Sequence, residues 1–157
     1  MTSLVGSIPT LFRHFLKLDE AAMSTSARHH QLTISHADDS PFAGEGLRSF
    51  FEYRQLGLDQ ATSGEFGAHV IRAVPGEHSP GQWHAHTLKF QMVYVTRGWV
   101  EFEYQDEGKV MLRAGSSAFQ PAGIVHRELR HSDDMELIEI TSPAEFETTP
   151  IEVADSG

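Results

Sequence analysis

The stretch GQWHAHTLKFQMVYVTRG, residues 81–98, places two histidines one residue apart among residues typical of β-strands. Side chains two positions apart in a strand point to the same face, so His84 and His86 would project together. Imidazole binds Fe, Mn, Co, Ni, Cu and Zn, and such a pair needs one or two more ligands to complete a metal site. An isolated pair of this kind more often marks two surface histidines on a loop, so the surrounding sequence has to decide.

Two further groups of residues follow this pair at fixed spacing. Gln91 lies five positions after His86, and Gly98 lies seven positions after Gln91. Residues 115–126, GSSAFQPAGIVH, begin with a glycine, continue with a PAG turn and end at His126. Together these residues resemble the two-part signature of the cupin superfamily, in which HxH, a glutamate and a glycine precede a glycine, a PxG turn and a third histidine.

The signature departs from its usual form at three positions. Gly81 lies three positions before His84, where the usual glycine lies six before, and Gln91 replaces the glutamate. Arg130 stands where the signature ends on an asparagine. Of these departures, only the glutamine changes an expected metal ligand.

The resemblance to cupins has implications for fold, cofactor and assembly. It implies an all-β fold, the double-stranded β-helix or cupin jelly roll, with a site inside the barrel. It implies that His84, His86, Gln91 and His126 bind one divalent transition metal, which would be Fe, Mn, Ni or Zn. Small cupins of this kind commonly form homodimers, so a homodimer is expected.

The pattern of the whole chain independently predicts an all-β sandwich or barrel. From Gln31 onward, short runs rich in β-branched and aromatic residues alternate with glycine, proline and acidic turns, which indicates nine or ten strands. The stretch YQDEGK predicts a hairpin turn. The runs lie within residues 31–35, 49–57, 67–76, 83–86, 90–98, 99–108, 109–115, 116–123, 125–131 and 135–143.

The two ends of the chain are expected to be peripheral to this barrel. Residues 1–40 are interpreted as an N-terminal extension or arm, residues 41–146 as the cupin barrel and residues 147–157 as an acidic tail. Within the extension, the apolar pattern of residues 9–23 predicts a short amphipathic helix. Either Met1 or Met23 could be the natural start.

Composition narrows the classes of partner. At 157 residues the chain suits one domain, and its 12 basic and 22 acidic residues give a net charge of −10, which disfavours nucleic acid. The absence of cysteine excludes disulfides, thiolate ligands and a cysteine nucleophile. No run approaches the roughly 20 apolar residues of a membrane span, and no signal peptide is evident. A cytoplasmic protein that binds a small molecule is expected.

A glutamine in place of the usual glutamate changes the expected chemistry of the metal. Three neutral imidazoles and an amide oxygen leave a divalent ion with its full charge, which makes it a stronger Lewis acid for a carboxylate or a developing enolate. A trivalent ion would be stabilised less well. Both effects favour isomerisation or elimination over oxygen activation.

Strand periodicity suggests which side chains accompany the metal. If His126 faces it, Glu128 and Arg130 share that face, so Glu128 is a candidate acid or base and Arg130 a candidate clamp for an anionic substrate. The alternative is that the strand end twists outward and both reach solvent. His69 and Arg72 lie on opposite faces of one strand, so at most one of them lines the cavity.

Three functions remain open at the level of sequence. The first is a metal-dependent isomerase or lyase that acts on a small anionic carbonyl or hydroxy compound, and the second is a metal-dependent dioxygenase. The third is a non-catalytic cupin that binds a small ligand. The Gln-bearing ligand set is similar to that of uronate-processing cupins, and stretches such as FQMVYVTRGW resemble methylsulfurylase-type cupins. That last activity depends on a thiol, which this chain lacks.

Overall fold

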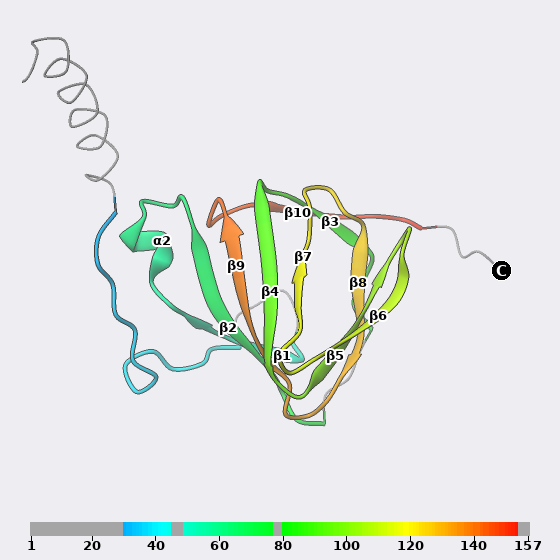
Figure 1. The fold of residues 1–157 in the computed structure, drawn as a ribbon, viewed down its shortest axis with the longest axis horizontal. Coiled ribbons are helices and arrows are strands. Elements are labelled where there is room, and N and C mark those ends of the chain that lie inside the picture. The colour runs from blue at the N-terminus through cyan, green and yellow to red at the C-terminus, as the bar shows by residue number, and fades with distance from the viewer. Residues whose placement is uncertain (1–29, 45–48, 77–79, 154–157) are drawn as a thin grey trace, which may run out of the picture. The chain divides into compact units, whose positions relative to one another are not determined.

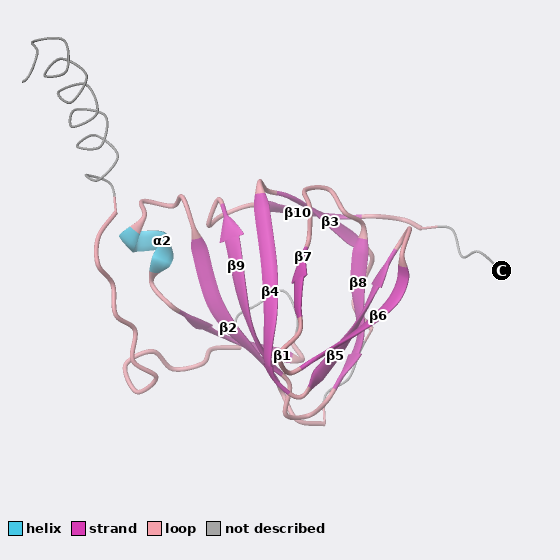
Figure 2. Cartoon of the chain, in the orientation of Figure 1, coloured by secondary structure: helices cyan, strands magenta, loops and turns pink. Residues whose placement is uncertain are grey.

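The computed structural model describes residues 30–44, 49–76 and 80–153, and its strands all lie within the unit Thr33–Gly157. These residues form ten β-strands and one short helix (Figure 1, Figure 2). The elements are β1 (Phe51–Gln55), α2 (Leu58–Ala61), β2 (Gly67–Ala73), β3 (His84–Thr87), β4 (Phe90–Arg97), β5 (Trp99–Tyr104), β6 (Gly108–Arg113), β7 (Ser117–Phe119), β8 (His126–His131), β9 (Glu136–Ser142) and β10 (Glu147–Pro150).

The strands form two five-stranded antiparallel sheets, with strand orders β1-β2-β9-β4-β7 and β10-β3-β8-β5-β6. From β2 onward the chain passes repeatedly from one sheet to the other, so that β9 lies between β2 and β4 although it follows them far along the sequence (Figure 1). This winding is the double-stranded β-helix, and the all-β jelly-roll prediction is confirmed. No helix in the described part of the chain has the length and apolar character needed to cross a membrane.

Nine of the ten predicted runs coincide with a strand. The run at residues 31–35 does not: no strand of the described residues pairs with it, and its Leu32 and Ile34 side chains are 90% and 70% exposed. Residues 147–150, assigned to the acidic tail, instead form β10 and pair with β3. The helix predicted over residues 9–23 lies outside the described residues, and α2 was not predicted.

The core lies between the two sheets and follows the period of two expected for strands. In β4, Val93 and Val95 are 3% and 0% exposed, whereas Tyr94 between them is 42% exposed. Burial of each such valine or phenylalanine contributes about 1.5–3 kcal/mol. The other sheet contributes Val100, Phe102 and Leu112 to the same cluster. This packing fixes the inner faces on which the polar side chains of the site are mounted.

Candidate metal centre

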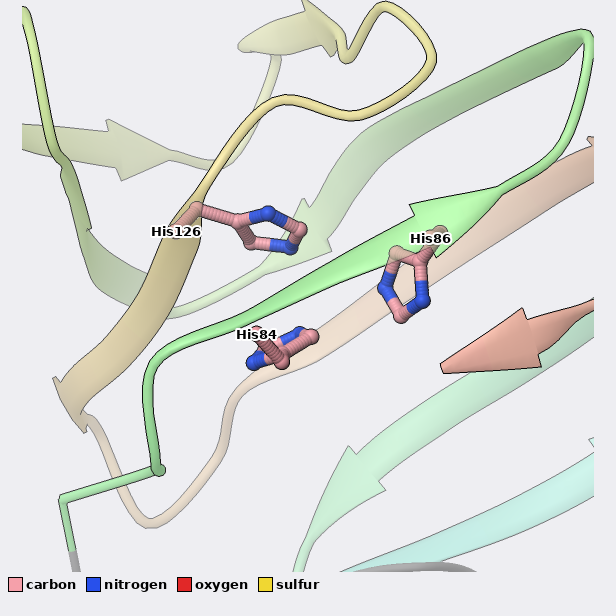
Figure 3. A group of neighbouring side chains, drawn as sticks. All are labelled: His84, His86 and His126. Atoms are coloured by element: carbon pink, nitrogen blue, oxygen red, sulfur yellow. The ribbon is translucent and has the colours of Figure 1, made fainter. Parts of the chain in front are cut away.

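Three histidines from two adjacent strands converge inside the barrel (Figure 3). His84 and His86 lie on β3, and His126 begins β8, where it is directly paired with His84. One ring nitrogen from each lies within 4.8 Å of the others. His84 and His126 are 5% and 2% exposed, and His86 is half-buried. The pair in the HxH motif and the distant third histidine are thus brought together as the sequence predicts.

The backbone orients two of these rings as a metal would require. Nδ1 of His84 lies 2.7 Å from the carbonyl oxygen of Gln82, and Nδ1 of His126 lies 3.1 Å from that of Ile124. A carbonyl oxygen only accepts, so Nδ1 carries the hydrogen in both rings and the lone pair of the neutral ring lies on Nε2. Metal-binding histidines are typically oriented by such a hydrogen bond from their second nitrogen.

The third ring is oriented by a residue that the sequence did not single out. Nδ1 of His86 lies 2.9 Å from Oγ1 of Thr148, on β10. Because residues 147–157 read as an acidic tail, the sequence contained no signal that Thr148 would contact the site.

Gln91 supplies an oxygen atom that fits a fourth ligand. It lies on β4, is 2% exposed, and its Nε2 donates a hydrogen bond of 2.8 Å to Oε1 of Glu139. Its Oε1 is buried and has no hydrogen-bond partner among the described residues. Leaving a buried acceptor unsatisfied costs about 1–3 kcal/mol. A cation beside that oxygen would remove the cost, so three imidazoles and this amide could hold a divalent ion.

A small cavity adjoins these side chains. Its volume is about 30 Å³, which is room for about one or two water molecules. His86, Gln91 and His126 line it together with the carboxylates of Glu128 and Glu139. The remaining walls consist of Phe51, Ile71, Val93, Val100, Phe102, Gln120 and Leu137. Polar groups therefore gather at one place in an otherwise apolar interior.

Glu128 lies on the inner face beside His126, as predicted, and is 7% exposed. Gly81 packs against it, since the Gly81 N–H donates a 2.7 Å hydrogen bond to the Glu128 carbonyl oxygen. A Cβ atom at position 81 would come 2.9 Å from Oε2 of Glu128. The glycine therefore leaves the space in which this carboxylate sits.

Arg130 does not share that face, and this corrects the expectation that it lines the cavity as an anion clamp. Glu101 pairs with Arg130 while the next residue, Phe102, pairs with Glu128, so Leu129 forms a β-bulge. The extra residue reverses the alternation of side chains beyond it. The Arg130 side chain is 62% exposed, and its Nε lies 2.6 Å from Oε2 of Glu101 on the outer face.

The bulge gives the inward position to His131 instead. His131 is 4% exposed, and its ring lies 5.9 Å from that of Phe50 and 5.1 Å from that of Phe51. His131 therefore packs in the apolar core and is not among the residues that line the cavity.

Glu139 and His69 form a pair, of which the sequence pattern indicated only His69. Nε2 of His69 lies 2.7 Å from Oε2 of Glu139. Arg72, in contrast, lies on the outer face and bonds to Glu52 at 2.7 Å. Glu139 follows the buried Leu137 by two positions in β9, and a charged residue in that inward register was the available signal.

The Glu139 carboxyl stays ionised despite its surroundings. Burial raises its pKa, but the hydrogen bond and charge of His69, together with the hydrogen bond from Gln91, outweigh burial and lower that pKa overall. A carboxylate paired with His69 therefore lies directly behind Gln91.

Comparison with known proteins agrees with this geometry. The family model of the cupin domain matches residues 69–141. No curated protein sequence matches the chain. Among solved structures, the polyketide cyclase RemF from Streptomyces resistomycificus is similar with a TM-score of 0.65 and 16% identity, over 80% of this chain and 89% of that one.

Two further solved structures share the fold. An RmlC-like cupin from Shewanella frigidimarina has a TM-score of 0.57 and 22% identity over 74% of this chain and 96% of its own. Hydroxypropylphosphonic acid epoxidase from S. wedmorenis has a TM-score of 0.52 and 17% identity over 70% of this chain and 59% of its own. The matched family model shows that residues 69–141 form a cupin domain, and the jelly roll and the three-histidine group agree with that assignment.

Proposed function

We propose that this cupin is a metal-dependent enzyme of isomerase or lyase type that acts on a small carbonyl or hydroxy compound. The observation that carries the proposal is the buried set of neutral donors, His84, His86, His126 and Gln91, with the carboxylate of Glu128 lining the same cavity. Neutral nitrogen and oxygen donors suit Fe, Mn, Ni or Zn in the divalent state.

A divalent ion held by those four residues would supply Lewis acidity toward an oxygen atom of the bound compound. Glu128 is then the group that moves a proton. It lies two positions after His126 on the inner face of β8, so it would accept a proton from the carbon next to that oxygen-bearing carbon and return it elsewhere. The same carboxylate would remove the proton and return it.

Tyr104 is the second proton-bearing group near this face. Burial and the nearby charge of Glu128 raise its pKa, although the hydrogen bond from Gln120 acts in the opposite direction. Gln120 Nε2 donates to the Tyr104 hydroxyl at 3.0 Å, so the hydroxyl retains its own hydrogen for donation. Tyr104 and Glu128 are both buried, at 7% exposed each.

The cavity and the position of Arg130 bear on the size and the charge of the substrate. At about 30 Å³ it admits only the reacting end of a compound. Since Arg130 points outward, the attraction for an anionic substrate would come from the ion and not from a cationic side chain on the inner face.

A metal-dependent dioxygenase is the second candidate, and one observation favours it. The charge of Glu139 lies one hydrogen bond behind Gln91 and would help to stabilise a more oxidised ion. The similar structures include both a cyclase and an epoxidase, so likeness of fold does not separate the two.

A homodimer belongs to the same proposal. The outer face of the first sheet exposes two aromatic side chains, Tyr94 at 42% and Phe119 at 59%. A second copy of the chain would cover them. Light scattering measures the molar mass in solution and so tells a dimer from a monomer.

Isotope exchange tests the enzyme proposal without knowledge of the substrate. Protein loaded with Zn²⁺, Mn²⁺, Ni²⁺ or Fe²⁺ is incubated in D₂O with pyruvate, dihydroxyacetone or galacturonate, and NMR follows deuterium uptake beside the carbonyl group. We expect uptake that needs the metal and is lost in Glu128→Gln. Oxygen consumption with Fe²⁺ alone would favour the dioxygenase, whereas binding without exchange or oxygen consumption would favour a non-catalytic cupin.

A further inference from the structure

A carboxylate, that of Glu139, contacts Gln91 from the side chain's amide end. Where the cupin signature has a glutamate, this chain has an amide, and the amide nitrogen donates to Oε1 of Glu139 at 2.8 Å. The two residues come from neighbouring strands, β4 and β9, whose register places Gln91 opposite Thr141 and Val93 opposite Glu139. The contact is therefore diagonal and lies within the inner face.

Glu139 is fixed from its other side by His69. The His69 side chain reaches Oε2 of Glu139 at 2.7 Å, and both side chains are largely buried, at 17% and 13% exposed. His69 and Glu139 are direct partners in the β2–β9 ladder, so the backbone sets this contact. Each carboxylate oxygen thus has its own partner, one imidazole and one amide.

The carboxylate determines which way the amide of Gln91 points. An ionised carboxylate only accepts hydrogen bonds, so the NH₂ group must face it and Oε1 must face away. The opposite orientation would bring the amide oxygen against a carboxylate oxygen. The buried Oε1, which has no hydrogen-bond partner among the described residues, is the result of this arrangement.

We propose that Glu139, held by His69, is a positioning residue of the metal centre that presents Gln91 Oε1 to the ion. This inference rests on the proposed metal site. The oxygen ligand is then a neutral amide held in place by Glu139, and it is easier to displace than a carboxylate.

Metal titration of a charge-exchanged pair tests the proposal. Co²⁺ is the probe, because its visible spectrum reports the ligand geometry and competition with a chromophoric chelator gives Kd. We expect Glu139→Gln to lose about 10–100-fold in Co²⁺ affinity, the usual effect of removing an outer partner of a metal ligand. Adding Gln91→Glu to that variant returns a carboxylate to the site and should recover most of the affinity.

Glu101→Gln is the matched control. Glu101 is also a strand glutamate paired with a basic side chain, Arg130, but it lies on the outer face. Its loss should leave both Kd and spectrum unchanged. His69→Gln, which keeps a hydrogen-bond donor near Glu139 but removes the imidazole, should give a smaller loss than Glu139→Gln.

The outcomes separate this inference from the function on which it rests. If the wild-type protein binds no Co²⁺, the metal centre itself is refuted. If the wild type binds and Glu139→Gln binds equally well with the same spectrum, only the role of Glu139 is refuted. Should Glu139→Gln lose its circular dichroism signal, the double variant decides: a folded double variant that binds Co²⁺ supports the proposal, and one that does not bind overturns it.

Discussion

Gly81 brings the backbone against the carboxylate of Glu128 closely enough that the residue type matters. A Cβ atom there would lie 2.9 Å from Oε2 and 3.3 Å from the carbonyl oxygen of Glu128. The usual cupin glycine lies three positions earlier, so the signature does not account for Gly81. Close packing of this kind is a property of the folded chain, and no motif spacing reports it.

At this residue we predict that Gly81→Ala moves the Glu128 carboxylate while leaving the three histidines in place. Overpacking should cost about 1–3 kcal/mol of unfolding free energy, measured by urea denaturation. Deuterium exchange of the substrate probes should fall at least tenfold while Co²⁺ affinity changes little. Gly44→Ala is the control, because a Cβ at position 44 meets no atom within 4 Å. Equal exchange rates in Gly81→Ala and wild type would contradict the role given to Glu128.

At the scale of the strand, β10 links the end of the barrel to the metal centre. Its four residues pair with β3, and Thr148 lies opposite His86, whose Nδ1 its hydroxyl contacts at 2.9 Å. β10 is an edge strand, and Pro150 at its end cannot donate to the ladder, which limits further pairing.

We predict that Thr148→Val, which keeps the shape but removes the hydroxyl, weakens Co²⁺ binding about tenfold because the His86 ring loses the partner that orients it. Thr149→Val is the matched control: the neighbouring threonine is exposed and points to the other face. Both variants should unfold at nearly the same temperature. A loss of affinity of the same size in both would mean that β10 acts through general packing.

Strands and signature residues were predictable because they obey local rules. The signature spacing identified the histidines that converge. The run FQMVYVTRG was recognised as a strand, and in β4 the alternation of a strand places Val93 inside and Tyr94 outside. The same rule failed at Arg130, since one bulged residue, Leu129, reverses the alternation and leaves no trace in the composition of VHRELRH. β10 and Thr148 were missed because the pairing that makes ETTP a strand is made with β3, far away in the sequence.

At the scale of the whole domain, a bound ion would connect the two sheets. His84, His86 and His126 belong to β3 and β8 of one sheet, whereas Gln91 belongs to β4 of the other. Opening of the barrel would separate these donors. Metal binding should therefore stabilise the fold as a unit and not only the loops near the site.

We predict that removal of the metal lowers the unfolding temperature of the entire domain. An ion at about 100 times its Kd adds roughly 2.7 kcal/mol to the unfolding free energy, which corresponds to a shift of roughly 5–11 °C for a domain of this size. Differential scanning calorimetry before and after dialysis against a chelator measures the shift, and re-addition of the ion should restore it. His126→Ala should unfold at the same temperature in both states, because one ligand is gone. If the wild-type transition does not move, or if His126→Ala responds as strongly as wild type, the ion does not bind between the sheets.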